Sequence, residues 1–195
     1  MKGNLGPKNC EDGDGWIWIG TSEGICFYLP DNDYFGTIES ENYKISGMVI
    51  DVKADNKNRI WIATYSGLYR YDKRSKELNF YSSDKYFEPR NISLTNTGDV
   101  WLSATDGKIY KYDVRTDSFI GYQILSNKEI SASVQLGNIL DGGNFGLIVS
   151  TNIEGLRQFE PNTGSVKKLF ENDRWNNIFI RTTFLNSDEE IWIAT

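Results

Sequence analysis

The residues of this chain that could support acid–base chemistry are carboxylates, because its 195 residues include no histidine. Asp12 with Asp14, and Glu189 with Glu190, are close enough in sequence to supply a general acid and a general base. Both pairs fall in expected turns or near a terminus, where charged side chains are usually solvated. The lack of histidine also excludes Ser-His-Asp and Cys-His nucleophiles and His-containing metal sites. We therefore predict no catalytic residues, no metal site and no cofactor, and we expect a chain that is not an enzyme.

Cys10 and Cys26 are the two cysteines of the sequence. Two cysteines can neither complete a zinc site nor form a disulfide framework. They could pair with each other. We favour a strand position for Cys26, because a free thiol behaves there as a small hydrophobic side chain.

Composition indicates a folded chain without a nucleic-acid partner. Hydrophobic residues make up 39% of the chain and aromatic residues 14%, which is enough for a packed core. The net charge of −6 offers no basic surface to phosphate backbones. No apolar run approaches the roughly 20 residues that span a bilayer, and residues 1–15 lack the apolar core of a secretory signal.

The elements that must position any site are repeats. Similar stretches, such as GWIWIGTSEGICFY, NRIWIATYSGLYRYD and GDVWLSATDGKIYKYD, recur along the chain. They are anchored at Trp18, Trp61, Trp101, Ile148 and Trp192, with separations of 43, 40, 47 and 44 residues. One four-stranded propeller blade takes about 40–45 residues.

Each repeat contains four segments with strand character. The first segments are residues 46–54, 91–96, 133–140 and 177–185, and each precedes an Asn/Asp/Gly turn. The second contains the anchor and is apolar almost throughout, as in a strand covered on both faces. A glycine at position 24, 67, 107 or 155 then marks a tight turn into a third strand, and an amphipathic fourth strand follows.

These features predict an all-β fold, a β-propeller of four-stranded antiparallel blades with about four and a half blades present. A β-sandwich would not require the same residues at each interval, and no stretch has a helical period. We expect residues 1–14 to form an N-terminal tail and residues 15–195 the partial β-propeller.

The pattern resembles the two-component regulator propeller repeat. WIGTSEGICFY, WIATYSGLYRYD, WLSATDGKIYKYD and IVSTNIEGLRQFE carry the resemblance, which extends from Gly15 to Thr195. The resemblance implies a periplasmic sensor region of a hybrid two-component system in gut Bacteroidetes, where such repeats sense oligosaccharides. Four positions depart from the pattern, namely Cys26, Leu29, Ile148 and Arg157.

The resemblance also implies that this chain is a piece of a larger polypeptide, with further propeller blades as partners. Open propeller ends expose strand edges and apolar faces. We therefore expect the fragment to self-associate, with two chains completing a ring of about eight blades. A compact four-bladed closure ranks second, because it leaves the last IWIAT redundant.

The recurring aromatic residues are best explained by packing between blades. Trp18, Trp61, Trp101 and Trp192 sit in apolar strands at the same register, so we assign them to the core and not to sugar stacking. Trp175 differs, because no other repeat has a tryptophan between its fourth strand and the next first strand.

Loops between the second and third strands, and between the fourth and the next first strand, emerge on one face of a propeller. We predict a ligand site there, since loops on a rigid scaffold often carry binding function. The candidate residues are Tyr65, Arg90, Asp106, Asn152, Glu154, Arg174, Trp175, Asn176 and Asn177. A solvated rim is the alternative for each of them.

We therefore expect a non-enzymatic sensor propeller that binds an oligosaccharide and signals to a kinase outside these residues. A protein-interaction scaffold is the second hypothesis. A glycan-active lyase or hydrolase is the third.

Overall fold

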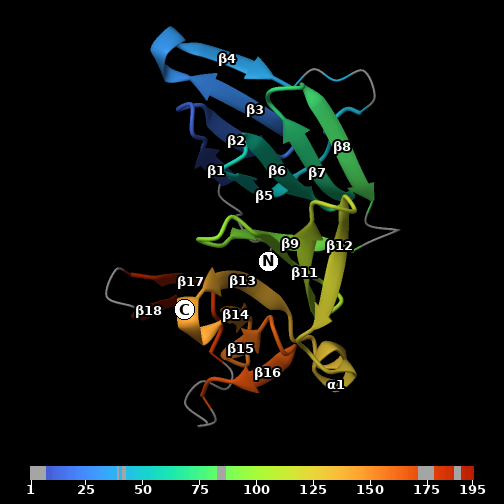
Figure 1. The fold of residues 1–195 in the computed structure, drawn as a ribbon, viewed down its shortest axis with the longest axis vertical. Coiled ribbons are helices and arrows are strands. Elements are labelled where there is room, and N and C mark those ends of the chain that lie inside the picture. Colours follow the sequence, from blue (N-terminus) through green and yellow to red (C-terminus); the bar gives the residue numbers. More distant parts are fainter. Residues whose placement is uncertain (1–7, 39, 41–42, 83–86, 171–177, 187–189) are drawn as a thin grey trace. The chain divides into compact units, whose positions relative to one another are not determined.

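The computed structural model describes residues 8–38, 40, 43–82, 87–170, 178–186 and 190–195. The chain divides into two compact units, Met1–Ile92 and Ser93–Thr195. Within these residues, four antiparallel sheets have four strands each and a fifth has two, and neighbouring strands follow one another in the chain (Figure 1). The predicted all-β fold, a partial β-propeller with about four and a half blades, is thus confirmed.

The first unit contains two complete blades. The first blade consists of β1 (Lys8–Glu11), β2 (Ile17–Thr21), β3 (Gly24–Leu29) and β4 (Tyr34–Thr37). The second consists of β5 (Val49–Ala54), β6 (Arg59–Thr64), β7 (Gly67–Asp72) and β8 (Glu77–Ser82). A short 3-10 helix, Pro30–Asn32, joins β3 to β4.

The boundary between the two units falls within β9, the first strand of the third blade. This blade consists of β9 (Pro89–Leu94), β10 (Val100–Ala104), β11 (Lys108–Asp113) and β12 (Ser118–Gln123). The fourth consists of β13 (Leu136–Asp141), β14 (Leu147–Thr151), β15 (Leu156–Glu160) and β16 (Ser165–Lys168). The two-stranded sheet consists of β17 (Thr182–Leu185) and β18 (Ile191–Ala194).

Among the described residues, helix is confined to short connections. The helix α1 (Asn127–Ser131) lies between β12 and β13, and a 3-10 helix, Gly143–Phe145, joins β13 to β14. The sequence analysis missed α1, although Ser126 and Glu129 have the spacing of a capping box, which the structure contains. No helix in the described ranges is long and apolar enough to cross a membrane.

Residues 1–14 were expected to form an N-terminal tail. For Lys8–Glu11 this prediction is wrong, because these residues form the strand β1. Residues Lys8–Glu11 pair antiparallel with β2, with Cys10 opposite Trp18. Without β1, the backbone groups on one edge of β2 would be unpaired. Their pairing with β1 satisfies them. The first blade therefore has four strands and does not begin at its second strand.

The anchor positions form the core, as predicted, in four of the five repeats. Trp18, Trp61, Trp101 and Ile148 are all at most 3% exposed. Trp192 differs, because its side chain is 54% exposed. The face that the tryptophan occupies in the other repeats is covered by packing, and no described segment covers it at β18.

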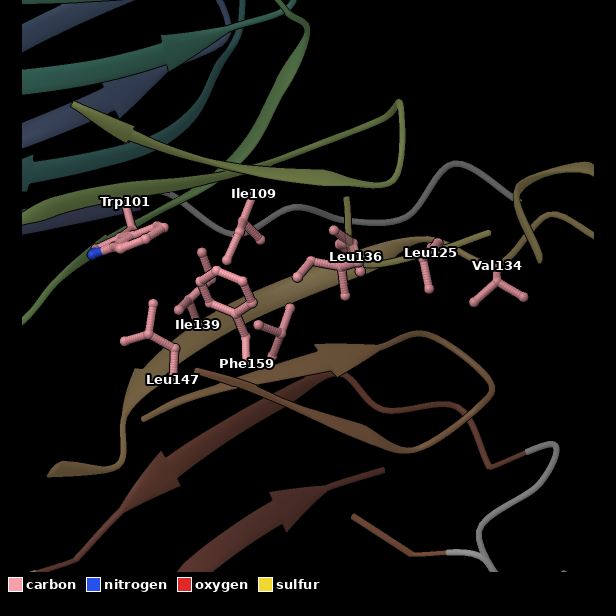
Figure 2. Close-up of a cluster of buried hydrophobic side chains, with 10 residues drawn as sticks. Trp101, Ile109, Leu125, Val134, Leu136, Ile139, Leu147 and Phe159 are labelled. Atoms are coloured by element: carbon pink, nitrogen blue, oxygen red, sulfur yellow. The ribbon is translucent and has the colours of Figure 1, made fainter. Parts of the chain in front are cut away.

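Each unit has its own apolar core between neighbouring blades. In the first unit, Trp18 and Val52 pack with Ile60 and Ile62 of β6. In the second unit, Trp101 and Ile109 of the third blade pack against Leu147 and Phe159 of the fourth (Figure 2). The same type of contact recurs because Trp18 and Trp101 each pack against the blade that follows within their own unit.

The turns between the second and third strands are tight turns at glycine, as the sequence predicted. Gly24, Gly67, Gly107 and Gly155 all have positive φ, a conformation that side chains with a Cβ rarely adopt. At Gly107 a Cβ would also lie 2.8 Å from the Cδ1 atom of Ile130. That close approach allows the segment around α1 to pack on this turn.

Cys10 and Cys26 are both free. Cys10 lies opposite Trp18, whereas Cys26 lies opposite Ile19. Neighbouring residues of a strand point to opposite faces, so the two thiols lie on opposite sides of the first sheet. The strand position predicted for Cys26 is confirmed, and the two thiols do not pair in this geometry.

Candidate functional site

Three of the predicted site residues, Asp106, Asn152 and Glu154, lie at one end of the strands of the second unit. We call this region the α1 side: the β10–β11 turn, the β14–β15 turn and residues 124–135. The polypeptide around α1 contacts both turns. The backbone NH groups of Ile124 and Leu125 donate to the carbonyl of Gly107, and Asn152 donates to the carbonyl of Gln135.

Asp106 is engaged within its own hairpin. Its Oδ2 accepts a hydrogen bond of 2.6 Å from the hydroxyl of Tyr110, and its Oδ1 accepts one from the backbone NH of Lys108. Burial raises the pKa of the Tyr110 hydroxyl, and the bond to Asp106 raises it further. The carboxylate therefore orders the β10–β11 turn.

Asn152 and Glu154 hold the β14–β15 turn in place. The amide of Asn152 accepts from the backbone NH of Gln135 at 2.8 Å and donates to the carbonyl of Ser133 at 3.3 Å. Glu154 accepts from Arg157 at 2.9 Å and from Lys168 at 3.1 Å. Both side chains already have partners within the second unit.

Arg157 is the centre of this network. It is 2% exposed, and it donates at 2.7 Å to Glu129 of α1 as well as to Glu154. Burial acts to raise the pKa of Glu129, but hydrogen bonds from Ser126 and Arg157 outweigh this effect and lower that pKa to about 2. A ligand on the α1 side would have to displace these bonds or bind around them.

The other predicted residues lie in the first unit or outside the described residues. Tyr65, 47% exposed, and Arg90, half-buried with no partner for its Nε atom, belong to the first unit. Arg174, Trp175, Asn176 and Asn177 lie outside the described residues. The ligand site predicted from the sequence therefore stays a prediction for these residues.

The second unit has a different depression at the opposite strand ends, which the sequence analysis missed. This polar groove, of about 580 Å³, lies between the β9–β10 and β13–β14 turns and the β15–β16 turn. Its polar lining consists of Thr95, Asn96, Thr97, Asp99, Lys111, Asp141, Glu160 and Asn162. The turns NTGD and DGGN, both rich in residues with polar side chains, were the available sequence signal.

Hydrogen bonds shape the polar groove. Asp141 accepts from the backbone NH groups of Asn96 at 2.8 Å and Gly143 at 3.0 Å, which ties the two turns together. Lys111 pairs with Asp99 at 2.8 Å. Hydroxyl, amide and carboxylate groups thus line one groove, with donors and acceptors suited to a polar, uncharged ligand.

An apolar groove of about 450 Å³ lies on the other side of the β13–β14 turn and shares Asn96, Asp141 and Gly143 with the polar groove. Its apolar lining includes Leu140, Phe145, Ile148, Leu169, Phe170, Leu185 and Ile191. Phe145 is 62% exposed. The groove lies between the fourth blade and the β17–β18 sheet.

No protein-family model matches this chain, and no curated protein matches it either. Solved structures do match, with probability 1.00. The extracellular domain assigned to the hybrid two-component system BT3049 from B. thetaiotaomicron is 20% identical, with a TM-score of 0.75 over 96% of this chain and 27% of that one. The extracellular domain of BT4673 from the same organism is 18% identical, with a TM-score of 0.76 over 95% of this chain and 25% of that one.

Virginiamycin B lyase from Staphylococcus aureus has a comparable likeness. Its catalytically inactive histidine-to-alanine variant, with quinupristin, is 14% identical, with a TM-score of 0.75 over 99% of this chain and 64% of that one. This chain spans about a quarter of the length of the two extracellular domains. At these identities the shared feature is the fold, and the expected likeness to sensor-region propellers is confirmed at that level.

Proposed function

We propose that this chain is part of a ligand-binding sensor propeller in a hybrid two-component system, located outside the cytoplasm, and that its ligand is an oligosaccharide. One observation carries the proposal: the fold matches extracellular domains of such systems over 96% of the chain. The repeat pattern, which is independent of that comparison, resembles the same class of sensor.

The polar groove is the place where we propose that the sugar binds. Sugars present many hydroxyl groups, which act as donors and acceptors at once and match amide, hydroxyl and carboxylate partners. Glu160 lines this groove, and its carboxylate accepts one long hydrogen bond of 3.3 Å, from the backbone NH of Asn162. It therefore retains capacity to accept from a ligand.

Binding would signal by a population shift. A ligand can change the balance between two arrangements of the sensor only if it binds one of them more tightly. The kinase that would read this change is expected elsewhere in the parent protein.

Titration calorimetry against a panel of oligosaccharides tests the proposal. We expect at least one sugar to bind, and Glu160→Ala to weaken its binding about tenfold, the loss of one or two hydrogen bonds. Asp31→Ala, an exposed carboxylate in the first unit, is the matched control and should bind normally. Weaker binding in Tyr65→Ala, with Glu160→Ala unaffected, would move the site to the predicted loop face. A panel without a binding sugar contradicts the ligand class.

A protein-interaction scaffold is the second candidate, favoured by the exposed aromatic residues Tyr34 and Phe35 on β4, which are 56% and 61% exposed. Lyase activity has less support. The inactive lyase variant lacks one histidine, and this sequence contains no histidine to take its place.

A further inference from the structure

The indole NH groups of the first two anchor tryptophans have the same kind of partner. Asp12, six residues before Trp18, accepts from its indole NH at 2.8 Å. Asp55 has the same place in the second repeat and accepts from the indole NH of Trp61 at 2.9 Å. In each case the other carboxylate oxygen accepts from the backbone of the turn. One aspartate thus serves the turn and the indole together.

The third repeat has a threonine at this position. The hydroxyl of Thr95 accepts from the backbone NH of Asp99 at 3.0 Å, so the bond within the turn is kept. A hydroxyl has only one oxygen, and no described residue accepts a hydrogen bond from the indole NH of Trp101. The Trp101 side chain is nevertheless a core residue, because the residue is 1% exposed.

The indole nitrogen of Trp101 faces the polar groove. The described side-chain atoms that are fully buried and without a partner belong to Arg90 and Ser103. The Trp101 nitrogen is not among them, so it reaches the surface of the groove that this residue lines. Figure 2 shows the nitrogen on the side of the ring that points away from the other labelled core side chains. The groove therefore contains a hydrogen-bond donor that the described residues leave unused.

A cation accompanies the aspartate in each of the first two repeats. The ammonium of Lys73, from the second blade, pairs with Asp12. The guanidinium of Arg59 pairs with Asp55 at 2.6 Å. Each buried carboxylate thus has a positive charge to balance it, without which its burial would be costly.

The polar groove offers no such cation among its described lining residues. Pro161 has the repeat position of Lys73, and Asp99 has that of Arg59. Lys111 supplies the positive charge of the lining, and its ammonium already pairs with Asp99 at 2.8 Å. Two further carboxylates line the groove. A negatively charged group would be repelled there, whereas an uncharged oxygen would not.

We infer that the indole NH of Trp101 donates to an uncharged oxygen of the ligand, at the place where the first two repeats have a carboxylate oxygen. The inference rests on the proposed function and narrows it, because the groove then takes neutral oligosaccharides and rejects acidic ones. A sugar hydroxyl and the carbonyl of an acetamido group are both acceptors of this kind. Trp101 is thus a specificity-determining residue as well as a core residue.

Thr95→Asp tests the inference by giving the third repeat the aspartate of the first two. The new carboxylate should accept from the indole NH of Trp101 and occupy the place of the ligand oxygen. Titration calorimetry should then show binding at least about tenfold weaker than in the parent chain. Thr116→Asp adds the same charge at an exposed turn of the third blade and should bind as the parent chain does.

The sugars are matched pairs that differ at C6 alone, with one acetamido sugar beside them. Galactotriose is compared with trigalacturonate, and β-1,4-mannotriose with β-1,4-trimannuronate. Tri-N-acetylchitotriose tests the acetamido carbonyl as the acceptor. We expect binding to be confined to neutral members of this set.

Nuclear magnetic resonance of the indole NH groups gives a readout that general destabilisation would not produce. The signal that disappears in Trp101→Phe belongs to Trp101. It should move downfield when a bound neutral sugar supplies an acceptor to the parent chain. It should also move downfield in Thr95→Asp without any sugar.

The outcomes separate this inference from the proposed function. A neutral sugar that binds without moving the Trp101 signal, or that binds Thr95→Asp as tightly as the parent chain, overturns the inference and leaves the sensor proposal standing. Tighter binding of the acidic member of a pair does the same. Absence of binding by every sugar contradicts the proposed ligand class, and the inference falls with it.

Discussion

At the scale of single residues, one short polar side chain holds the turn before the second strand in four of the five repeats, whereas Gly142 has this place in the fourth repeat. Asp12 accepts from the backbone NH of Trp16, Asp55 from that of Arg59, and Asn186 from that of Glu190. Asp12 and Asp55 also accept from the indole NH of Trp18 and Trp61, at 2.8 and 2.9 Å. The expectation that Asp12 is merely solvated is wrong, because it is 7% exposed and also pairs with Lys73.

The carboxylate pair Asp12 and Asp14 yields a matched prediction. Asp12→Ala should lower the free energy of unfolding by about 3 kcal/mol, since it leaves the buried Lys73 ammonium and the Trp18 indole without their main acceptor. Asp14 contacts the same Lys73 at 2.8 Å, but its side chain is 51% exposed. Asp14→Ala should therefore cost less than about 1 kcal/mol. Urea unfolding of both variants makes the comparison, and equal losses would contradict the assignment.

At the scale of strands, a polar side chain on β13 attaches the β17–β18 sheet to the fourth blade. The Asn138 amide donates to the carbonyl of Thr183 at 2.7 Å and accepts from its backbone NH at 3.2 Å. Asn186 donates to Glu190 on the β18 side, and backbone groups alternate in direction along a strand, so those of Thr183 point toward β13. A register shift between Leu136 and Ile139 marks a β-bulge around Asn138, and bulges often re-aim a side chain in this way.

Asn138→Ala should loosen this attachment. Thr183 is 3% exposed, so the loss of its partner leaves buried backbone groups unsatisfied, at a cost of about 1–3 kcal/mol. The effect should be local, with hydrogen exchange of residues 182–185 accelerated and that of β10 and β11 unchanged. Asn162→Ala, at the exposed β15–β16 turn, is the control. Uniform acceleration across the unit would indicate general destabilisation instead.

At the scale of the whole molecule, folding alters the acid titration of several carboxylates in opposite directions. Burial acts to raise the pKa values of Asp12, Asp55 and Glu129, but hydrogen bonds to each carboxylate outweigh it and the pKa values are lowered. At Asp51, which is 4% exposed, burial dominates and raises the pKa. Three of these four carboxylates have lowered pKa values and one has a raised value. Acid should therefore destabilise the fold.

Glu129→Gln isolates one part of this acid sensitivity. The pKa of Glu129 falls from 4.5 to about 2 on folding, so its contribution is complete above pH 4.5 and is lost as the pH falls toward 2. The shift corresponds to up to about 3 kcal/mol. Glu129→Gln should therefore be less stable than the parent chain at pH 7 and equally stable near pH 2. Denaturant unfolding across that range measures the difference, and a gap that does not close in acid contradicts the assignment.

The blades could be predicted from the sequence. Anchor spacing, alternating apolar residues and the glycines before the third strands predicted the strand order, because these signals act within one repeat. β1 was missed because KNCE has little strand character of its own and is a strand only through its pairing with β2. The α1 helix was missed because its signal is a cap of two residues and not a helical period.

Tertiary structure decided which polar residues are free for a ligand and which aromatic residues are covered. Asp106, Asn152 and Glu154 lie on one side of the second unit, but bonds to Tyr110, Gln135 and Arg157 occupy them. Trp192 has the same sequence context as Trp61, yet one is 54% exposed and the other is fully buried. Local sequence sets strand and turn, whereas burial depends on segments far away in the chain, as Asp12 and Lys73 illustrate at 61 residues apart.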